Sequence, residues 1–256
     1  MEKLTVVLQA GGESKRMGSS KALVPFCGAP LICRGLLRLG HIADELIITT
    51  NEPESLAFLC SKARHGKLSL CADVYEERSA LNGMYTALYY AQNPYVAVVA
   101  CDMIFPSAPI LLAQRDILVA TGADAVVPHV SHGYEPFHAV YRRETCLPLV
   151  KAALDDGQTR ATIWYEHAHL IKLERQAMLE IDPRGGNLIN VNTPQELAAI
   201  EQRILAGTMT TADGSMDSDD PVHVSSDPEH SRCHHPVCSY FSNNLISNQH
   251  KQDAGR

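Results

Sequence analysis

A glycine pair followed by clustered cations lies directly after the first apolar run of the chain. The stretch Leu8-Gln-Ala-Gly-Gly-Glu-Ser-Lys-Arg-Met17 contains Gly11 and Gly12, which leave backbone N–H groups open to a closely approaching anion. Arg16 can form a bidentate pair with phosphate, and Lys21 supplies a point charge. A tight turn would explain the glycines but not the cations. The pattern therefore indicates binding of a polyphosphate, although it is neither the dinucleotide pattern nor the P-loop.

A single carboxylate, Asp102, ends the apolar run 96–101. A carboxylate at the end of a buried strand is unfavourable through desolvation unless it is paired or coordinates a metal. Mg²⁺ prefers one or two carboxylates together with phosphate oxygens. We therefore predict that Asp102 holds Mg²⁺ and acts with Arg16 and Lys21 as the catalytic set, while a helix N-cap is the alternative interpretation.

Four more polar residues follow strand-like runs or precede a helix. Asn51 and Asp73 could hydrogen-bond a base or ribose, or they could be ordinary polar residues after strands. Asn190 and Asn192 alternate, so in an extended segment they share one face and could contact a heterocycle. Alternatively, these two asparagines only prepare the turn before the next helix.

Strand-like and helix-like segments alternate through residues 1–206. Continuous apolar runs predict strands covered on both faces, and these are Leu4–Gln9, Glu45–Thr50, Leu68–Cys71, Tyr95–Cys101 and Ala125–His129. Helix starts are indicated at Pro30 and Pro53, at Ser107 as a cap, and at the capping box Thr193-Pro-Gln-Glu196. The pattern predicts a three-layer α/β fold with a mainly parallel sheet and helices on both faces. The part from 134 to 192 looks less regular and could close the other side of a cleft.

Composition narrows the class of protein. The net charge of −7 argues against a nucleic-acid partner, and no apolar run reaches the ~20 residues of a membrane helix. The amino terminus lacks the apolar core of a signal peptide, so a cytoplasmic location with reduced cysteines is expected. Residues 207–256 are polar and aperiodic, and we predict a disordered tail there. Its Cys233-His-His-Pro-Val-Cys238 could bind a metal or be plain tail.

Three motifs in order resemble the molybdenum cofactor guanylyltransferases. Gly11-Gly-Glu-Ser-Lys-Arg-Met-Gly18-Ser-Ser-Lys21-Ala-Leu follows the pattern G-G-x-S-x-R-M-G-x-x-K-A-L of that family without a gap. Cys101-Asp-Met-Ile-Phe105 resembles C-D-M-P-F, and Asn190-Val-Asn-Thr-Pro-Gln-Glu-Leu197 resembles N-I-N-T-P-E-[DE]-L. Ser79-Ala-Leu-Asn-Gly83 departs at two positions from G-P-L-x-G, and Ser20 stands where an acid is common. The resemblance covers about residues 4–205.

This resemblance implies a Rossmann-like fold of the nucleotide-diphospho-sugar transferase type. It also implies an Mg²⁺-dependent enzyme that transfers GMP from GTP to the terminal phosphate of molybdopterin and releases pyrophosphate. Molybdenum-insertion and molybdoenzyme-maturation proteins are implied as further partners. Asn190 and Asn192 would lie toward the pterin. The residues implied to bind the nucleotide are Leu8, Gln9, Ala10, Gly11, Gly12, Lys21, Asn51, Asp73, Gly83 and Asp102.

Two other readings of the motifs remain. Cytidylyltransferases and sugar-phosphate nucleotidylyltransferases share the loop architecture, but the glycine pair at 11–12 resembles the guanylyl branch more than the A-A-G of cytidylyl relatives. A non-catalytic nucleotide-binding module, with the Cys/His tail as a metal or partner module, is the reading from a different class.

Overall fold

The central sheet forms from the apolar runs of the sequence. The computed structural model describes residues 2–11, 21–60, 68–183, 191 and 193–206. Within them, one path of the sheet runs β10 (Leu170–Glu174), β7 (Ala125–Val130), β9 (His138–Arg142), β6 (Tyr95–Ala100), β1 (Leu4–Gln9), β4 (Glu45–Thr49) and β5 (Leu68–Cys71), and β8 (Gly133–Tyr134) pairs with β7. The five predicted strands are confirmed to within a residue at their ends.

The sheet is mainly parallel, as predicted. Strand β1 lies parallel to both β4 and β6, β4 is parallel to β5, and β7 is parallel to β10. Strand β9 is antiparallel to both β6 and β7. The connection from β7 to β9 spans only residues 131–137, and a parallel return would need a crossover of a dozen or more residues. The short connection therefore dictates the reversed direction.

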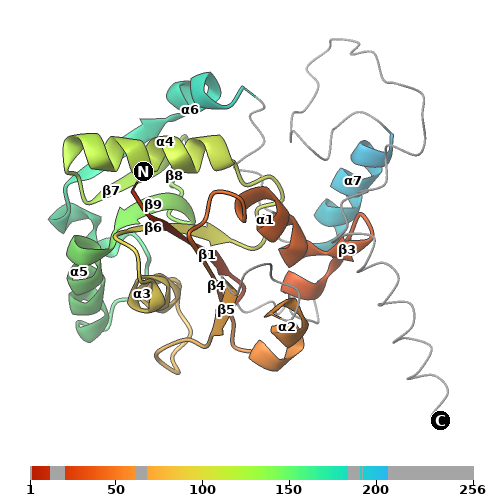
Figure 1. Cartoon of the computed structure of the whole chain (residues 1–256), viewed down its shortest axis with the longest axis horizontal. Helices are drawn as coiled ribbons and strands as arrows, with labels where there is room; N and C mark the ends of the chain where they lie inside the picture. The colour runs from red at the N-terminus through yellow and green to blue at the C-terminus, as the bar shows by residue number, and fades with distance from the viewer. Residues whose placement is uncertain (1, 12–20, 61–67, 184–190, 192, 207–256) are drawn as a thin grey trace.

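Helices cover both faces of the sheet (Figure 1). They are α1 (Leu31–Leu39), α2 (Pro53–Cys60), α3 (Ala80–Tyr90), α4 (Ala108–Thr121), α5 (Arg143–Asp155), α6 (Arg175–Ile181) and α7 (Pro194–Leu205), with 3₁₀ turns η1 (Lys21–Leu23) and η3 (Ile163–His167). Side chains of β1 alternate between the faces. Leu8 packs into the core shared with α1, α2 and α4, whereas Val7 packs into the core shared with α3 and α5. Burial on both faces explains why the strands read as unbroken apolar runs.

Polar caps fix the starts of α4 and α7, as predicted. The Ser107 hydroxyl accepts the Ile110 N–H before α4, and Thr193 with Glu196 forms the predicted capping box before α7. Pro53 is the first residue of α2, as expected, whereas Pro30 lies one residue before α1. The hydroxyls of Ser107 and Thr193 satisfy N–H groups that a helix end leaves without an intrahelical partner.

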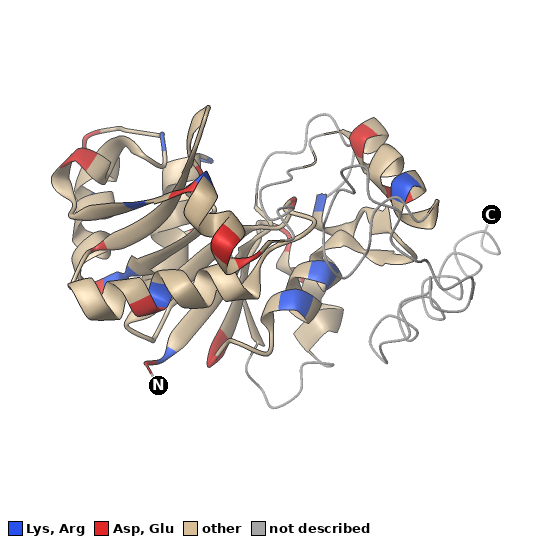
Figure 2. Ribbon diagram, turned by 90° about the horizontal axis from the view of Figure 1, so that it is seen from above, with Lys and Arg blue, Asp and Glu red and all other residues tan. Residues whose placement is uncertain are grey.

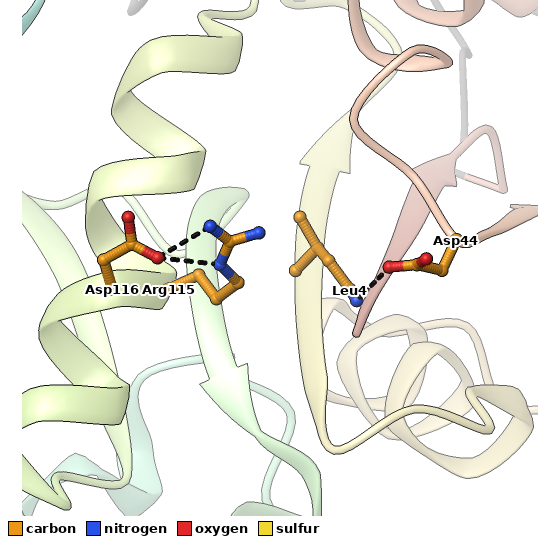
Figure 3. A network of polar contacts seen from close by, with 4 residues as sticks. All are labelled: Leu4, Asp44, Arg115 and Asp116. Atoms are coloured by element: carbon orange, nitrogen blue, oxygen red, sulfur yellow. Dashed lines mark hydrogen bonds and ion pairs between the residues drawn. The ribbon is translucent and has the colours of Figure 1, made fainter. Parts of the chain in front are cut away.

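Figure 3 shows two polar contacts away from the strand ends discussed below. The Leu4 N–H donates to Asp44 Oδ2 at 2.9 Å, and the Asp44 N–H donates back to the Leu4 carbonyl. This exchange pins the start of β1 to the residue before β4 and so sets their register. On α4, the Arg115 guanidinium donates to Asp116 Oδ1 from both Nε and Nη2.

A two-residue turn shapes the small ribbon of β2 (Pro25–Phe26) and β3 (Ala29–Pro30). Cys27 and Gly28 both have positive φ, 48° and 79°, which is the conformation of the tight hairpin turn. The Cys27 N–H donates to Glu201 Oε1 of α7 at 2.7 Å. The ribbon is therefore held against the last helix, which lies beside β3 in Figure 1.

The part from 134 to 192 is more regular than its sequence indicates. It contributes β9, α5, η3, β10 and α6. Pro148 lies inside α5, a position that normally marks a helix break, so the sequence pattern hides this helix. Figure 2 shows some helices with both basic and acidic residues and one with basic residues alone, which is consistent with the two arginines of α1. No helix in the described ranges is both long and apolar enough to cross a bilayer. The tail 207–256, including its Cys/His run, lies outside the described residues.

Candidate active site

Four chain segments converge at the carboxyl edge of the parallel strands. Ala10 and Gly11 follow β1, Asn51 follows β4, Asp73 follows β5 and Asp102 follows β6. The Ala10 N–H donates to the Thr49 carbonyl at 2.8 Å, and the Cys101 N–H donates to the Gln9 carbonyl at 2.9 Å. The carboxyl edge is where open α/β sheets bind ligands. The predicted polar residues therefore share one edge, fixed by backbone bonds between neighbouring strands.

Lys21 and Asp102 form an ion pair across this edge. Lys21 Nζ lies 2.7 Å from Asp102 Oδ2, and the two side chains are 17% and 23% exposed. Lys21 begins η1, whose Ala22 is fully buried, so the start of this turn is anchored in the core. The positive charge of the ammonium offsets the negative charge of the carboxylate, which would otherwise be partly buried without a partner at the end of β6. An anionic ligand and its divalent cation would meet both charges at one point.

Asn51 links Gly11 to Asp73. Its Nδ2 donates to the Gly11 carbonyl at 3.2 Å and to Asp73 Oδ2 at 3.0 Å. A Cβ at Gly11 would lie 3.3 Å from Asn51 Nδ2 and 3.5 Å from Asp73 Oδ2. A larger residue at position 11 would therefore crowd both polar groups. The structure brings together three of the residues that the sequence singled out.

Gly83 lies against Gln9, the last residue of β1. A Cβ at Gly83, in the first part of α3, would lie 3.2 Å from Gln9 Nε2 and 3.3 Å from Oε1. Ser79 caps this helix by accepting the Asn82 N–H at 3.0 Å. Gly83 therefore leaves room for the Gln9 amide between α3 and the sheet.

Val191 lies beside Asp102. Its N–H donates to the Asp102 carbonyl at 3.2 Å, which is a contact across 89 positions of the chain. The predicted site residues Gly12, Arg16, Asn190 and Asn192 lie outside the described residues.

Comparison with known proteins places the chain in a family. The family model described as the MobA-like NTP transferase domain matches residues 6–170, which include every site residue described above except Val191. The chain belongs to this family. It is a nucleotidyltransferase, as the three motifs predicted, and the predicted fold class is confirmed.

Relatives and solved structures agree with this assignment. The chain is 30% identical to a molybdenum cofactor guanylyltransferase of Desulfosudis oleivorans, over 82% of this chain and all of that protein. It is 28% identical to a probable molybdenum cofactor guanylyltransferase of Natranaerobius thermophilus, over 77% of this chain and 94% of the relative. The fold is similar to molybdopterin-guanine dinucleotide biosynthesis protein A of Archaeoglobus fulgidus, with a TM-score of 0.67 and 21% identity, over 77% and 97% of the two chains.

A buried histidine that the sequence analysis missed holds the segment after Asp102. His138 of β9 is fully buried, and its Nε2 accepts the Ser107 N–H at 3.0 Å. The Ser107 hydroxyl donates to Asp182 Oδ2 at 2.5 Å. Burial lowers the pKa of His138 to about 4, so the ring is neutral at pH 7 and can accept this bond. A histidine at the start of an apolar run gives no sequence signal of its partner.

Cys101, next to Asp102, is not poised for nucleophilic chemistry. Burial, together with the charge of Asp102, raises the pKa of its thiol to about 12. The thiolate is the reactive form of cysteine, so a thiol held protonated at neutral pH is inert. Cys101 therefore contributes no charge beside Lys21 and Asp102.

Proposed function

We propose that the protein transfers GMP from GTP to the terminal phosphate of molybdopterin and releases pyrophosphate, in molybdenum cofactor biosynthesis. The observation that carries the proposal is the convergence of Gly11, the Lys21–Asp102 pair and the Asn51–Asp73 pair at one sheet edge. The names of the curated relatives supply the substrates. Molybdopterin as the acceptor rests on those names and on the motif that contains Asn190 and Asn192.

Lys21 and the glycine loop act on the charge of the triphosphate. The attacking group is already an anionic phosphate oxygen, so the step needs no general base. A bond forms from this oxygen to the α-phosphorus of GTP, and the bond from the α-phosphorus to the leaving pyrophosphate breaks. Lys21 and Arg16, with the backbone N–H groups near Gly11, stabilise the charge that moves onto pyrophosphate. Positioning and charge neutralisation then account for the catalysis.

Asp102 is suited to hold Mg²⁺. It provides one partly exposed carboxylate, the ligand type that Mg²⁺ takes when phosphate oxygens complete its shell. Bound Mg²⁺ would supply positive charge to the phosphate oxygens. The Lys21 ammonium already contacts Asp102 Oδ2. It would therefore lie close to the phosphate oxygens that the metal ion binds.

Asp73 and Asn51 are suited to the nucleoside. The carboxylate of Asp73 can accept hydrogen bonds from ring or amino N–H groups of guanine. Asn51 donates to that carboxylate and to the Gly11 carbonyl, and it thereby fixes the distance between the loop and the base-binding side.

A pyrophosphate-release assay tests the proposal. Purified molybdopterin and Mg²⁺ are combined with GTP, CTP, ATP or UTP in turn, and release is expected with GTP. Asp102→Asn should abolish Mg²⁺-dependent turnover while the thermal unfolding midpoint stays within a few degrees. Asp155→Asn is the matched control, because Asp155 is also paired with a lysine, Lys151, on the exposed surface of α5.

Three results would contradict the proposal. Full turnover in Asp102→Asn would remove Asp102 from the metal role. Equal release with all four nucleotides, or release that does not depend on molybdopterin, would contradict the substrates.

A further inference from the structure

The Gln9 side chain carries an unpaired amide at the proposed site. Gln9 Nε2 is buried and has no hydrogen-bond partner among the described residues. Buried amide groups in folded proteins are nearly always hydrogen-bonded, and an unmade bond is destabilising. The Gln9 backbone, in contrast, is paired with β4 and β6 on either side. The backbone of Gln9 is therefore fixed, whereas its amide nitrogen makes no hydrogen bond to any described residue.

The neighbour of this amide is a glycine inside a helix. A Cβ at Gly83 would come within 3.2 Å of Nε2 and 3.3 Å of Oε1. Glycine within a helix is destabilising relative to alanine. At position 83 it leaves space for the amide of Gln9, and the missing hydrogen bond leaves that amide able to turn. Both features favour a ligand contact over a packing role.

The surroundings of the amide favour a neutral ligand group. Gln9 points to the α3 side of the sheet, as Val7 does two residues earlier. Two residues further on, the Gly11 carbonyl is bonded to Asn51, which also contacts Asp73. Lys21 supplies the full positive charge that phosphate needs, whereas a neutral amide donor matches a carbonyl oxygen.

We propose that the Gln9 amide donates a hydrogen bond to the 6-oxo group of the bound guanine and so helps to determine base specificity. Guanine presents an acceptor at this position, and adenine presents a donor. Asp73 would supply the complementary acceptor for a guanine N–H. This inference rests on the proposed function, since it assumes that GTP binds at this edge.

Nucleotide binding to a Gln9→Met variant tests the inference. Affinities for GTP and for 2-aminopurine riboside triphosphate, which lacks the 6-oxo group, are measured by calorimetry with Mg²⁺ present. Gln9→Met should bind GTP about fivefold more weakly, as expected for one lost neutral hydrogen bond, and should bind the analogue unchanged. The ligand-free variant should melt at the same or a higher temperature, because it no longer buries an unpaired amide.

Two further variants complete the design. Gln92→Met is the matched control, because the Gln92 amide donates to the Tyr90 carbonyl outside this edge. Gln9→Glu keeps the shape of the side chain and removes the donor, so it should lose at least as much GTP affinity as Gln9→Met. If Gln9→Met fails to fold, Gln9→Glu decides the question.

The outcomes separate this inference from the proposed function. Wild-type protein that binds no GTP refutes both. Wild-type protein that binds GTP, with Gln9 variants that bind it equally well, refutes only the role of Gln9. Equal weakening of GTP and of the analogue places the amide on another part of the nucleotide and also refutes the contact with the 6-oxo group.

Discussion

Acid should weaken the fold through one buried histidine. His138 is fully buried, and its Nε2 accepts the Ser107 N–H. A protonated ring carries N–H on both nitrogens and can no longer accept this bond. Burial is the main cause that lowers the pKa of His138 to about 4; the nearby charge of Arg38 lowers it further, and Asp182 opposes the shift. Acid therefore acts on the segment that joins Asp102 to α4.

The size of the effect follows from the two pKa values of His138. The unfolded histidine titrates near 6.5 and the folded one near 4, so between these values only the unfolded chain takes up the proton. The contribution to stability is fully present above about pH 6.5 and is lost as the pH falls toward 4. The free energy of unfolding should drop by about 2 kcal/mol from pH 7 to pH 5 and by about 3 kcal/mol at pH 4.

Urea denaturation at pH 7, 6 and 5 measures this loss. The wild-type protein should lose about 2 kcal/mol more than His138→Gln over this range, since glutamine can accept the Ser107 N–H without titrating. His132→Gln is the control, because His132 is exposed near the β7–β8 turn, and it should behave like the wild type. A loss in His138→Gln equal to that of the wild type would refute the reasoning.

Two other substitutions test the phosphate site and the last helix. Lys21→Met should lower turnover at least tenfold with little change in the melting temperature, because it removes charge stabilisation from the transition state; a change in melting temperature alone would rule out the phosphate role. Thr193→Ala should lower the free energy of unfolding by about 1 kcal/mol in urea denaturation, because it removes the hydroxyl of the capping box before α7; an unchanged midpoint would show that the cap is not needed.

Local patterns predicted the parts of the fold that depend on neighbouring residues. The strands β1 and β6 are short apolar runs buried on both faces, and β4 and β5 are short apolar runs that are less completely buried, so the sequence marks all four. The caps at Ser107 and Thr193 were readable because a hydroxyl two or three positions before an N–H acts locally.

Features set by distant contacts were not predictable. The place of β9 between β6 and β7 depends on pairing with a strand far away in the chain, and α5 tolerates Pro148 inside it. In the site, residue types pointed to Lys21 and Asp102 separately. Only the fold shows that they touch across 81 positions of the chain. The unpaired amide of Gln9 is likewise invisible to any reading of local pattern.

The contact of α7 with the rest of the fold bears on protein synthesis. Leu197 and Ile204 of this helix pack with Phe26, Ile104 and Phe105, the apolar residues next to the segments that carry Lys21 and Asp102. A nascent chain emerging from the ribosome exposes that apolar cluster until residue 204 has been made and released. The segments that carry Lys21 and Asp102 therefore gain this support only after α7 has left the ribosome, and a chain that stopped before α7 would leave the apolar cluster exposed.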